Sequence, residues 1–249
     1  MKTMVNGFLL GFSYFSVLPI HLKALQSSQQ LYRALLFSLP VVGLVLALIC
    51  VGLFTLLKGV LPLTFAAILC SVIYLILYGF LHLEAVCDVI DGWYASLSGK
   101  DIYAIMKEPQ IGAIGAIGTF LLILLKISAL CFLLIYSKEQ FFIIAAVFSR
   151  LGLIYGLSWF DFHEKSKFAL QLKSAATFQV TAFVSILFMV LSYFILDSTT
   201  VFIFLLLTLF VIFSSLYILK KKFGFLNGDC LGFSLELSEV LLLIVGLML

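Results

Sequence analysis

Long apolar segments constrain the fold of this chain more than any other feature. They are nearly free of charge, and most reach the ~20 residues that an α-helix needs to cross a bilayer. They occupy residues 34–57, 63–81, 112–136, 140–160, 177–196, 201–219 and 231–249. Only 11% of the 249 residues are charged, whereas a soluble domain carries about a quarter. We therefore expect an all-α, polytopic membrane protein with about seven transmembrane helices, forming one domain over residues 1–249.

The segment 4–20 is apolar but ambiguous. It contains Asn6, Ser13 and Ser16 and stops at Pro19. We expect an interfacial or re-entrant helix here, with a transmembrane helix as the alternative. The start of the chain shows no small-residue cleavage site, so a removable signal peptide is not expected.

Basic residues indicate the orientation, because cytoplasmic loops are enriched in lysine and arginine. One set of connections holds only Lys58 and Lys138. The other set holds Lys2, Lys23, Arg33, Lys100, Lys107, Lys165, Lys167, Lys173, Lys220, Lys221 and Lys222. This asymmetry predicts a cytoplasmic N-terminus, and it places the connections 82–110 and 220–230 in the cytoplasm.

An acidic stretch follows the second apolar segment. Glu84, Asp88 and Asp91 are spaced i, i+4, i+7, so on a helix they share one face, and His82 lies two residues upstream. Three like charges on one face repel each other unless a cation lies between them. Carboxylate oxygens suit Mg²⁺, which also binds substrate phosphates. The alternative is a solvated juxtamembrane helix that happens to be acidic.

A second motif combines charge with glycine. Lys107 and Glu108 precede Gly112, Gly115 and Gly118. A phosphate-binding loop that opens a helix has this composition, because helix N-terminal amides attract anions. Taken alone, the glycine spacing favours the other interpretation, which is close packing of helices in the membrane.

A third motif spans residues 227–239. Asn227 and Gly228 form a turn signal, and Asp229, Glu236 and Glu239 follow at helical spacing. The two glutamates lie inside an apolar segment, where ionisable residues are costly and normally pair with a cation or bind a ligand.

Cationic residues within or beside the apolar segments are the candidate partners for these carboxylates. Arg150 and Lys126 lie in mid-segment and either bind phosphate or neutralise a buried carboxylate, and Arg33 lies at the edge of its segment. We expect Asp229 to join the metal site, and Glu236 and Glu239 to pair with Arg150 or Lys126.

Other site classes are not expected. The five cysteines show no CxxC pairing and no histidine at metal-ligand spacing, which argues against disulfides and zinc. No basic stripe interleaved with aromatic residues is present, so we expect no nucleic-acid partner.

In their order along the chain, these motifs resemble the cobalamin synthase family, the adenosylcobinamide-GDP ribazoletransferases. The family patterns H-L-D-G-L-A-D-x-x-D-G and E-I-M-K-D-S-R-I-G-T-x-G are similar to His82–Gly92 and Ala104–Gly115. Its Ser-Arg pair matches Ser149–Arg150, and T-G-D-x-L-G-A-x-x-E-L-x-E is similar to Asn227–Glu239. Near the N-terminus, F-x-T-x-x-P-V resembles Phe12–Ile20.

The chain departs from these family patterns at several positions. Glu84 and Glu108 replace aspartate, and Asn227 replaces threonine. Pro109 and Gln110 replace a Ser-Arg pair, which removes a cation that could bind phosphate.

The resemblance implies a Mg²⁺-dependent transferase. It would join adenosylcobinamide-GDP to α-ribazole or its 5′-phosphate and release GMP, the nucleotide-loop assembly step of adenosylcobalamin biosynthesis. The location implied is a bacterial or archaeal cell (inner) membrane, crossed several times and in contact with membrane lipid, with the active site facing the cytoplasm. A homo-oligomer is left open.

The candidate site residues fall into three groups. The metal ligands expected are Glu84, Asp88, Asp91 and Asp229. The catalytic residues expected are Asp91, His82, Lys107 and Arg150, with either Asp91 or His82 as the general base. The substrate-binding residues expected are Arg33, Gly112, Gly115, Asn227, Gly228, Glu236 and Glu239.

Two other functions remain as alternatives. A CDP-alcohol phosphotransferase also binds metal and a nucleotide diphosphate through helical carboxylates, but its motif D-G-x₂-A-R-x₈-G-x₃-D-x₃-D requires an arginine that is absent here. An ion-coupled transporter would use intramembrane charges, but usually shows paired repeats, and none is evident.

Overall fold

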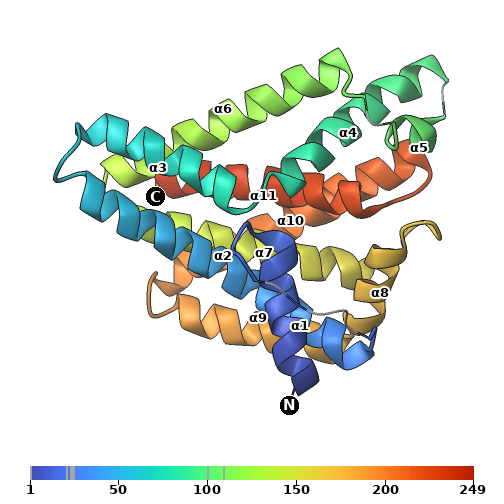
Figure 1. Ribbon diagram of the computed structural model, residues 1–249, viewed down its shortest axis with the longest axis horizontal. Coiled ribbons are helices and arrows are strands. Elements are labelled where there is room, and N and C mark those ends of the chain that lie inside the picture. The colour runs from blue at the N-terminus through green and yellow to red at the C-terminus, as the bar shows by residue number, and fades with distance from the viewer. Residues whose placement is uncertain (1, 21, 23–25, 100, 109) are drawn as a thin grey trace.

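The computed structural model describes residues 2–20, 22, 26–99, 101–108 and 110–249. Lys23, Lys100 and Pro109, which enter the orientation and motif arguments above, lie outside the described residues. Within these ranges the chain forms eleven α-helices and one 3₁₀ helix, and no strand (Figure 1). The expectation of an all-α protein is confirmed.

The helices are α1 (Lys2–Phe15), α2 (Gln29–Leu57), α3 (Leu63–Leu77), α4 (Leu81–Ala95), η1 (Ser96–Ser98), α5 (Ile102–Ile105), α6 (Ala113–Ile135), α7 (Glu139–Trp159), α8 (Lys167–Ala175), α9 (Phe178–Ser192), α10 (Ser198–Phe223) and α11 (Gly228–Met248).

Five of these helices are long and apolar enough to cross a membrane: α2, α6, α7, α10 and α11. Two further pairs qualify together but are sharply bent, α3 with α4 by 81° and α8 with α9 by 77°. Each pair forms a broken span or a re-entrant loop, so the described residues hold up to seven spans. The expectation of a multi-pass membrane protein with about seven transmembrane helices is confirmed.

The bend between α3 and α4 determines where the acidic residues of α4 lie in the bundle. Gly79 and Phe80 both have positive φ, 74° and 60°, which ends α3 and turns the chain. The carbonyl of Leu77 at the end of α3 accepts a hydrogen bond from the Val17 amide, 2.9 Å away, in the segment that follows α1. The N-terminal segment thereby supports the bend, and α4 continues beside α6 and α11.

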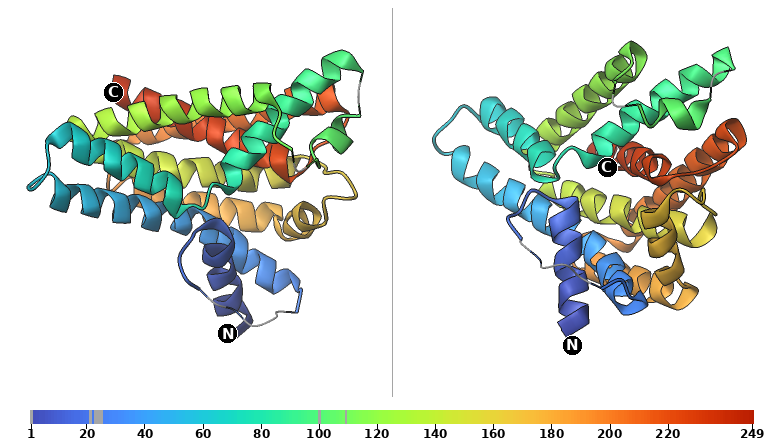
Figure 2. Two further views of the ribbon diagram at one scale, coloured as in Figure 1. Left: turned by 45° about the horizontal axis from the view of Figure 1, so that its top comes forward. Right: turned by 45° about the vertical axis from the view of Figure 1, so that its right-hand side comes forward.

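α1 is a short helix that packs across α2. A Cβ atom on Gly7 would collide with the Leu31 carbonyl, and one on Gly11 would collide with the Ser38 hydroxyl, so the two glycines permit the close crossing. Both views in Figure 2 show α1 projecting away from the long helices. With 14 residues it is about 21 Å long, less than the ~30 Å hydrocarbon core. This geometry supports an interfacial or re-entrant helix over the transmembrane alternative.

α7 is the central helix, buried along most of its length against α2, α10 and α11. Glycines allow its neighbours to approach closely. A Cβ atom on Gly43 of α2 would collide with the Ala146 carbonyl and approach Arg150 Cδ to 2.7 Å, whereas one on Gly52 of the same helix would meet nothing within 4 Å.

This contrast gives a test of the packing. We expect Gly43→Ala to destabilise the protein by about 1–3 kcal/mol, because overpacking at a helix contact forces the backbones apart. Gly52→Ala is the matched control and should leave stability unchanged or slightly raised. The melting temperature of the purified protein in detergent measures both, and equal melting temperatures would contradict the packing of α2 on α7.

Candidate active site

Four charged side chains lie fully buried in the middle of the bundle: Lys126 of α6, Arg150 of α7, and Glu236 and Glu239 of α11. Lys126 Nζ is 2.6 Å from Glu236 Oε2 and 3.1 Å from Glu239 Oε1. Arg150 Nη1 is 2.7 Å from Glu239 Oε2. Two cations and two carboxylates therefore neutralise each other within one network, as the cost of burying charge in a membrane protein demands.

Hydroxyl groups complete most of the network. Tyr74 and Ser149 donate to the two oxygens of Glu239, at 2.8 and 2.9 Å. Lys126 also donates to the Tyr78 hydroxyl at 3.3 Å. Among the described residues, Glu236 Oε1 has no hydrogen-bond partner. Glu239 is thus the more fully satisfied of the two glutamates.

The network confirms that Glu236 and Glu239 pair with Lys126 and Arg150. The expectation that Arg150 contacts phosphate and that the two glutamates bind substrate stays a prediction. In the structure all three side chains are enclosed by neighbouring helices, and none of them lines the cavity described below. Their mutual attraction explains this position, because opposite charges in an apolar bundle are most stable in contact with each other.

Removing one member of the network should destabilise the protein. Glu236→Gln leaves Glu239 as the one carboxylate that faces both Lys126 and Arg150 in the network, and breaking a buried pair in this way costs about 3–5 kcal/mol. Adding Lys126→Met to that variant should recover part of the loss. The control is Asp161→Asn, which removes an exposed pair with Lys173 and should change little.

Melting temperature and yield of folded protein measure these variants. A double variant that is less stable than Glu236→Gln alone would contradict the pairing.

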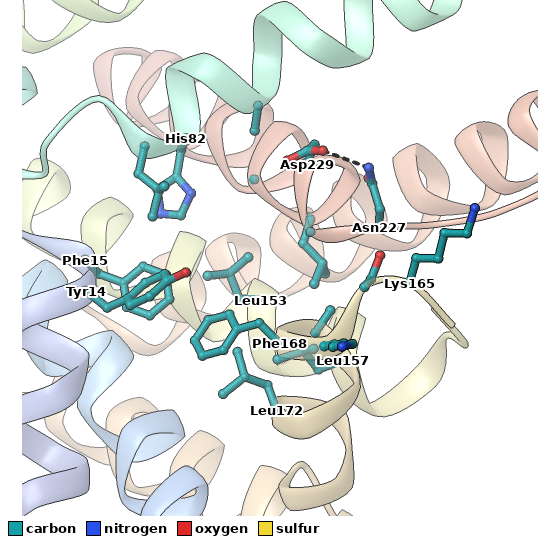
Figure 3. A pocket seen from close by; sticks show the side chains of 18 of the residues that line it. Tyr14, Phe15, His82, Leu153, Leu157, Lys165, Phe168, Leu172, Asn227 and Asp229 are labelled. Atoms are coloured by element: carbon teal, nitrogen blue, oxygen red, sulfur yellow. Dashed lines mark hydrogen bonds between the residues drawn. The ribbon is translucent and has the colours of Figure 1, made fainter. Parts of the chain in front are cut away.

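The cavity with the most polar and charged lining lies where α1, α4, α8 and α11 meet, and its volume is about 380 Å³. Figure 3 shows apolar side chains on one side of it, including Phe15, Leu153, Phe168 and Leu172. Polar and charged side chains are gathered elsewhere on the wall: His82, Lys107, Lys165, Lys167, Asn227 and Asp229. The cavity therefore combines an apolar wall with a charged rim.

An ion pair joins two of the predicted motifs at this rim. Lys107 Nζ lies 2.9 Å from Asp229 Oδ2. Asn227 Nδ2 donates to the same oxygen at 2.7 Å, while Asn227 Oδ1 caps α11 by accepting from the Cys230 amide (Figure 3). Burial lowers the pKa of Lys107, but the hydrogen bond and negative charge of Asp229 outweigh it and raise that pKa above its ordinary value. Lys107 is therefore positively charged at neutral pH.

The acidic residues of α4 do not all face one point. Glu84 is exposed and Asp88 is half-buried, and the charges acting on Asp88 include those of Asp229, Glu84 and Lys107. Asp91 instead faces the start of α6. Of these acidic residues and their partners, only Asp229 and Lys107 line the cavity, and Asp88 lies within electrostatic range of both.

Asp91 binds the glycines of the second motif. Its two carboxylate oxygens accept hydrogen bonds from the amides of Gly112 and Gly115, each at 2.8 Å. A Cβ atom on either glycine would collide with the Asp91 carboxylate. In this structure the amides at the start of α6 bind a carboxylate of the chain itself, and the two glycines make room for it.

Whether this site fits a metal depends on how many protein ligands the metal needs. In the part of the chain that the structure describes, no three His, Cys, Asp or Glu side chains form a group that could hold an ion. Mg²⁺, however, is often held by one or two carboxylates together with substrate phosphates. Asp88 and Asp229, whose negative charges act on each other, are the two carboxylates that suit this smaller requirement, and Glu84 lies one helical turn from Asp88.

Of the two candidate bases, only His82 lines the cavity. Its ring stacks on Phe15, with centroids 5.8 Å apart, and lies against Gly232 of α11, where a Cβ atom would come within 3.3 Å of Nδ1. His82 is thus held between α1 and α11 at the edge of the cavity. Asp91 is already engaged by the α6 amides.

The remaining predicted substrate-binding residues lie in two places. Gly228 lines the cavity. Arg33 borders a separate apolar groove between α1, α2 and α9. Sequence reasoning missed Tyr103, Lys165 and Lys167, which do line the cavity. In the sequence the charge of Lys165 and Lys167 indicates only orientation, although two lysines beside the start of an amphipathic helix could also suggest an anion-binding role.

The sequence of this chain is similar to those of known proteins. The model of the cobalamin-5-phosphate synthase family matches residues 7–247 of this chain. The chain belongs to this family. The match includes all the helices that form the cavity and the buried network, so both lie within the cobalamin-5-phosphate synthase domain.

Individual relatives agree with this assignment. A protein of Brevibacillus brevis is 29% identical over 251 residues, covering 97% of this chain and 98% of the relative. One of Clostridium botulinum (strain Langeland) is 26% identical over 252 residues and covers both chains completely. One of Pseudomonas syringae pv. syringae is 33% identical over 153 residues, covering 60% of this chain and 62% of the relative. All three are named adenosylcobinamide-GDP ribazoletransferase. No solved structure matches the chain.

Proposed function

We propose that this protein is an adenosylcobinamide-GDP ribazoletransferase. A ribose hydroxyl of α-ribazole, or of its 5′-phosphate, attacks the phosphorus nearest the corrin. The bond between that phosphorus and the bridging oxygen of the diphosphate breaks, and GMP leaves. The products are adenosylcobalamin or its 5′-phosphate, and GMP. The observation that carries the proposal is a cavity with an apolar aromatic wall and a charged rim, within a chain of the cobalamin-5-phosphate synthase family.

The two sides of the cavity suit the two parts of such a substrate. Lys107, Lys165 and Lys167 place positive charge at the rim, where they would bind the diphosphate. Phe15 and Phe168 offer apolar surface to the ribazole base or to the edge of the corrin. The cavity holds the reacting end of the substrate, and the rest of the corrin extends outside it.

His82 is the proposed general base. It lies on the cavity wall, and its ring is fixed between Phe15 and Gly232. A neutral imidazole accepts the proton of the attacking hydroxyl and keeps it during the displacement. Lys107 stays paired with Asp229 in the free protein and stabilises the negative charge that develops on the phosphoryl oxygens.

Mg²⁺ is proposed as the cofactor that arrives with the diphosphate. Asp88 and Asp229 would hold it, with Glu84 as a further carboxylate within reach of the same region. When bound, it supplies the charge that polarises the phosphoryl oxygens and stabilises the leaving group.

The activity assay is the release of GMP from adenosylcobinamide-GDP by purified protein, with and without α-ribazole. We expect release to require α-ribazole. Asp229→Asn should lower turnover by about 10²-fold, because it weakens both the Lys107 pair and the proposed cation site. The matched control is Asp161→Asn, which breaks an ion pair of similar length, 2.7 Å, between two residues that do not line the cavity, and it should keep near-normal turnover.

The proposal fails if folded protein releases no GMP, or if release is independent of α-ribazole. The role of Asp229 fails if Asp229→Asn and Asp161→Asn are equally active.

We further propose that the protein lies in the cell membrane of a bacterium or archaeon, with the cavity facing the cytoplasm. Lys165 in the α7–α8 connection, together with Lys167 and Lys173 of α8, supports this orientation. All five native cysteines are buried, so single introduced cysteines can report accessibility.

A cysteine at Ser174 of α8 should be shielded from a membrane-impermeant maleimide in intact cells, and one at Ser198, at the start of α10, should react. Both serines are exposed. The reverse labelling pattern would overturn the orientation and the cytoplasmic site.

A further inference from the structure

A second cavity lies on the opposite face of α4 from the acidic residues. Its volume is about 450 Å³, and it is enclosed by α4, α6, α10 and α11. The wall includes Ile90 and Trp93 of α4, Ile218 and Leu219 of α10, and Phe233 and Leu237 of α11. Among the described residues that form the wall, only Tyr94 and Ser215 carry a hydroxyl group. The Ser215 hydroxyl is already bonded to Ser234 and to the Val211 carbonyl. We call this cavity the lateral groove.

Such a wall fits a hydrocarbon chain. Nearly every surface it presents is apolar, and the polar atom at Ser215 is satisfied within the protein. The nucleotide or ribazole of the proposed reaction would find no hydrogen-bond partners along most of this wall. An acyl chain needs none, and gains by contact with closely packed aliphatic and aromatic side chains.

The end of the lateral groove is cationic. Ser215, Leu219 and Lys222 are spaced i, i+4, i+7, so Lys222 continues the stripe of α10 that lines the groove. Lys222 Nζ lies 5.5 Å from the centroid of the Trp93 ring. Lys220 and Lys221 complete the last turn of α10.

These lysines are available to an anion. Within the described ranges, no carboxylate forms an ion pair with any of the three. Lys220 and Lys221 are exposed, and Lys222 is half-buried over Trp93. Tryptophan and tyrosine prefer the level of lipid headgroups, and Trp93 and Tyr94 are both partly exposed beside the groove.

We propose that the lateral groove binds one anionic phospholipid. An acyl chain lies between α4, α10 and α11, and the phosphate and its negative headgroup contact Lys222 and its neighbours. Charge complementarity selects this occupant, because an anionic leaflet attracts clusters of basic residues. The bound lipid supports the face of α4 opposite Glu84 and Asp88.

The lipid site is tested by native mass spectrometry of the purified protein. The probes are dioleoylphosphatidylglycerol and dioleoylphosphatidylcholine, which share acyl chains and differ in net charge. We expect the wild-type protein to retain one phosphatidylglycerol in preference to phosphatidylcholine. Glycerol 1-phosphate, which has the phosphate without the chains, should not displace it.

Two substitutions separate the charge from the groove. Lys222→Gln should lower the retained phosphatidylglycerol several-fold, and Leu219→Trp, which fills the groove, should do the same. The matched control is Lys58→Gln. Lys58 Nζ also lies 5.5 Å from an aromatic centroid, that of Phe54, but its turn holds no other lysine. This control should retain the lipid as the wild type does.

Equal retention of the two lipids by the wild-type protein would overturn the proposal. Unchanged retention of phosphatidylglycerol by Lys222→Gln would also overturn it. Lys222 lies in the last turn of α10, where we expect the substitution to leave the fold intact. An equal loss for Lys58→Gln and Lys222→Gln would also overturn it, because it would show that charge anywhere on the protein determines retention.

Discussion

The pairing of buried charge is the interaction on which the rest of this structure depends. Lys126, Arg150, Glu236 and Glu239 lie in the apolar bundle, where an unpaired charge would be strongly destabilising. Their contacts connect α6, α7 and α11, and Tyr74 adds α3. Because opposite charges must meet, the network fixes the depth and rotation of these helices relative to one another.

The fixed positions of these helices also determine which side chains line the cavity. The start of α11 holds Asn227 and Asp229, two turns before Glu236. The start of α6 holds Asp91 through the amides of Gly112 and Gly115, and its later turns carry Lys126. The helices that neutralise charge in the middle of the bundle are therefore the ones that place charge at the rim. One end of α11 supplies polar and charged groups to the cavity, and the following turns supply carboxylates to the buried network.

Local patterns in the sequence were sufficient for the helices and for the buried pairs. The apolar segments match α2, α3, α6, α7, α9, α10 and α11 because a membrane span requires a long uncharged run. The pairing of Glu236 and Glu239 could be predicted because very few cations lie inside the apolar segments. Both arguments depend on the free-energy cost of exposing polar groups to hydrocarbon. The sequence alone shows which polar residues lie inside apolar segments.

Contacts between segments that are distant in the sequence could not be predicted from local sequence patterns. The bend at Gly79 and Phe80 depends on the Val17 amide, and nothing in the local sequence indicates that contact. Tertiary packing also decides three features of the site. Asp91 accepts hydrogen bonds from the α6 amides, Lys165 and Lys167 line the cavity, and Arg33 lies at a different groove. Helical spacing shows that carboxylates share a face, but not which neighbour that face meets.

The same limit bears on the departures from the family pattern. Gln110 stands where the family has an arginine, and in the structure it is exposed. Positive charge at the cavity comes instead from Lys107 and from the connection between α7 and α8, about 60 residues further along the chain. A comparison of motifs shows that the arginine is missing. The fold shows that lysines from other segments line the cavity.

A structure of the protein bound to adenosylcobinamide-GDP, determined by cryo-electron microscopy without α-ribazole, tests the central claim most directly. We predict that the diphosphate contacts Lys107 beside Asp229, and that apolar parts of the ligand lie against Phe15 and Phe168. The buried network of Lys126, Arg150, Glu236 and Glu239 should remain intact and out of contact with the ligand. A diphosphate bound to Arg150 in the middle of the bundle, or on another face of the protein, would contradict this account.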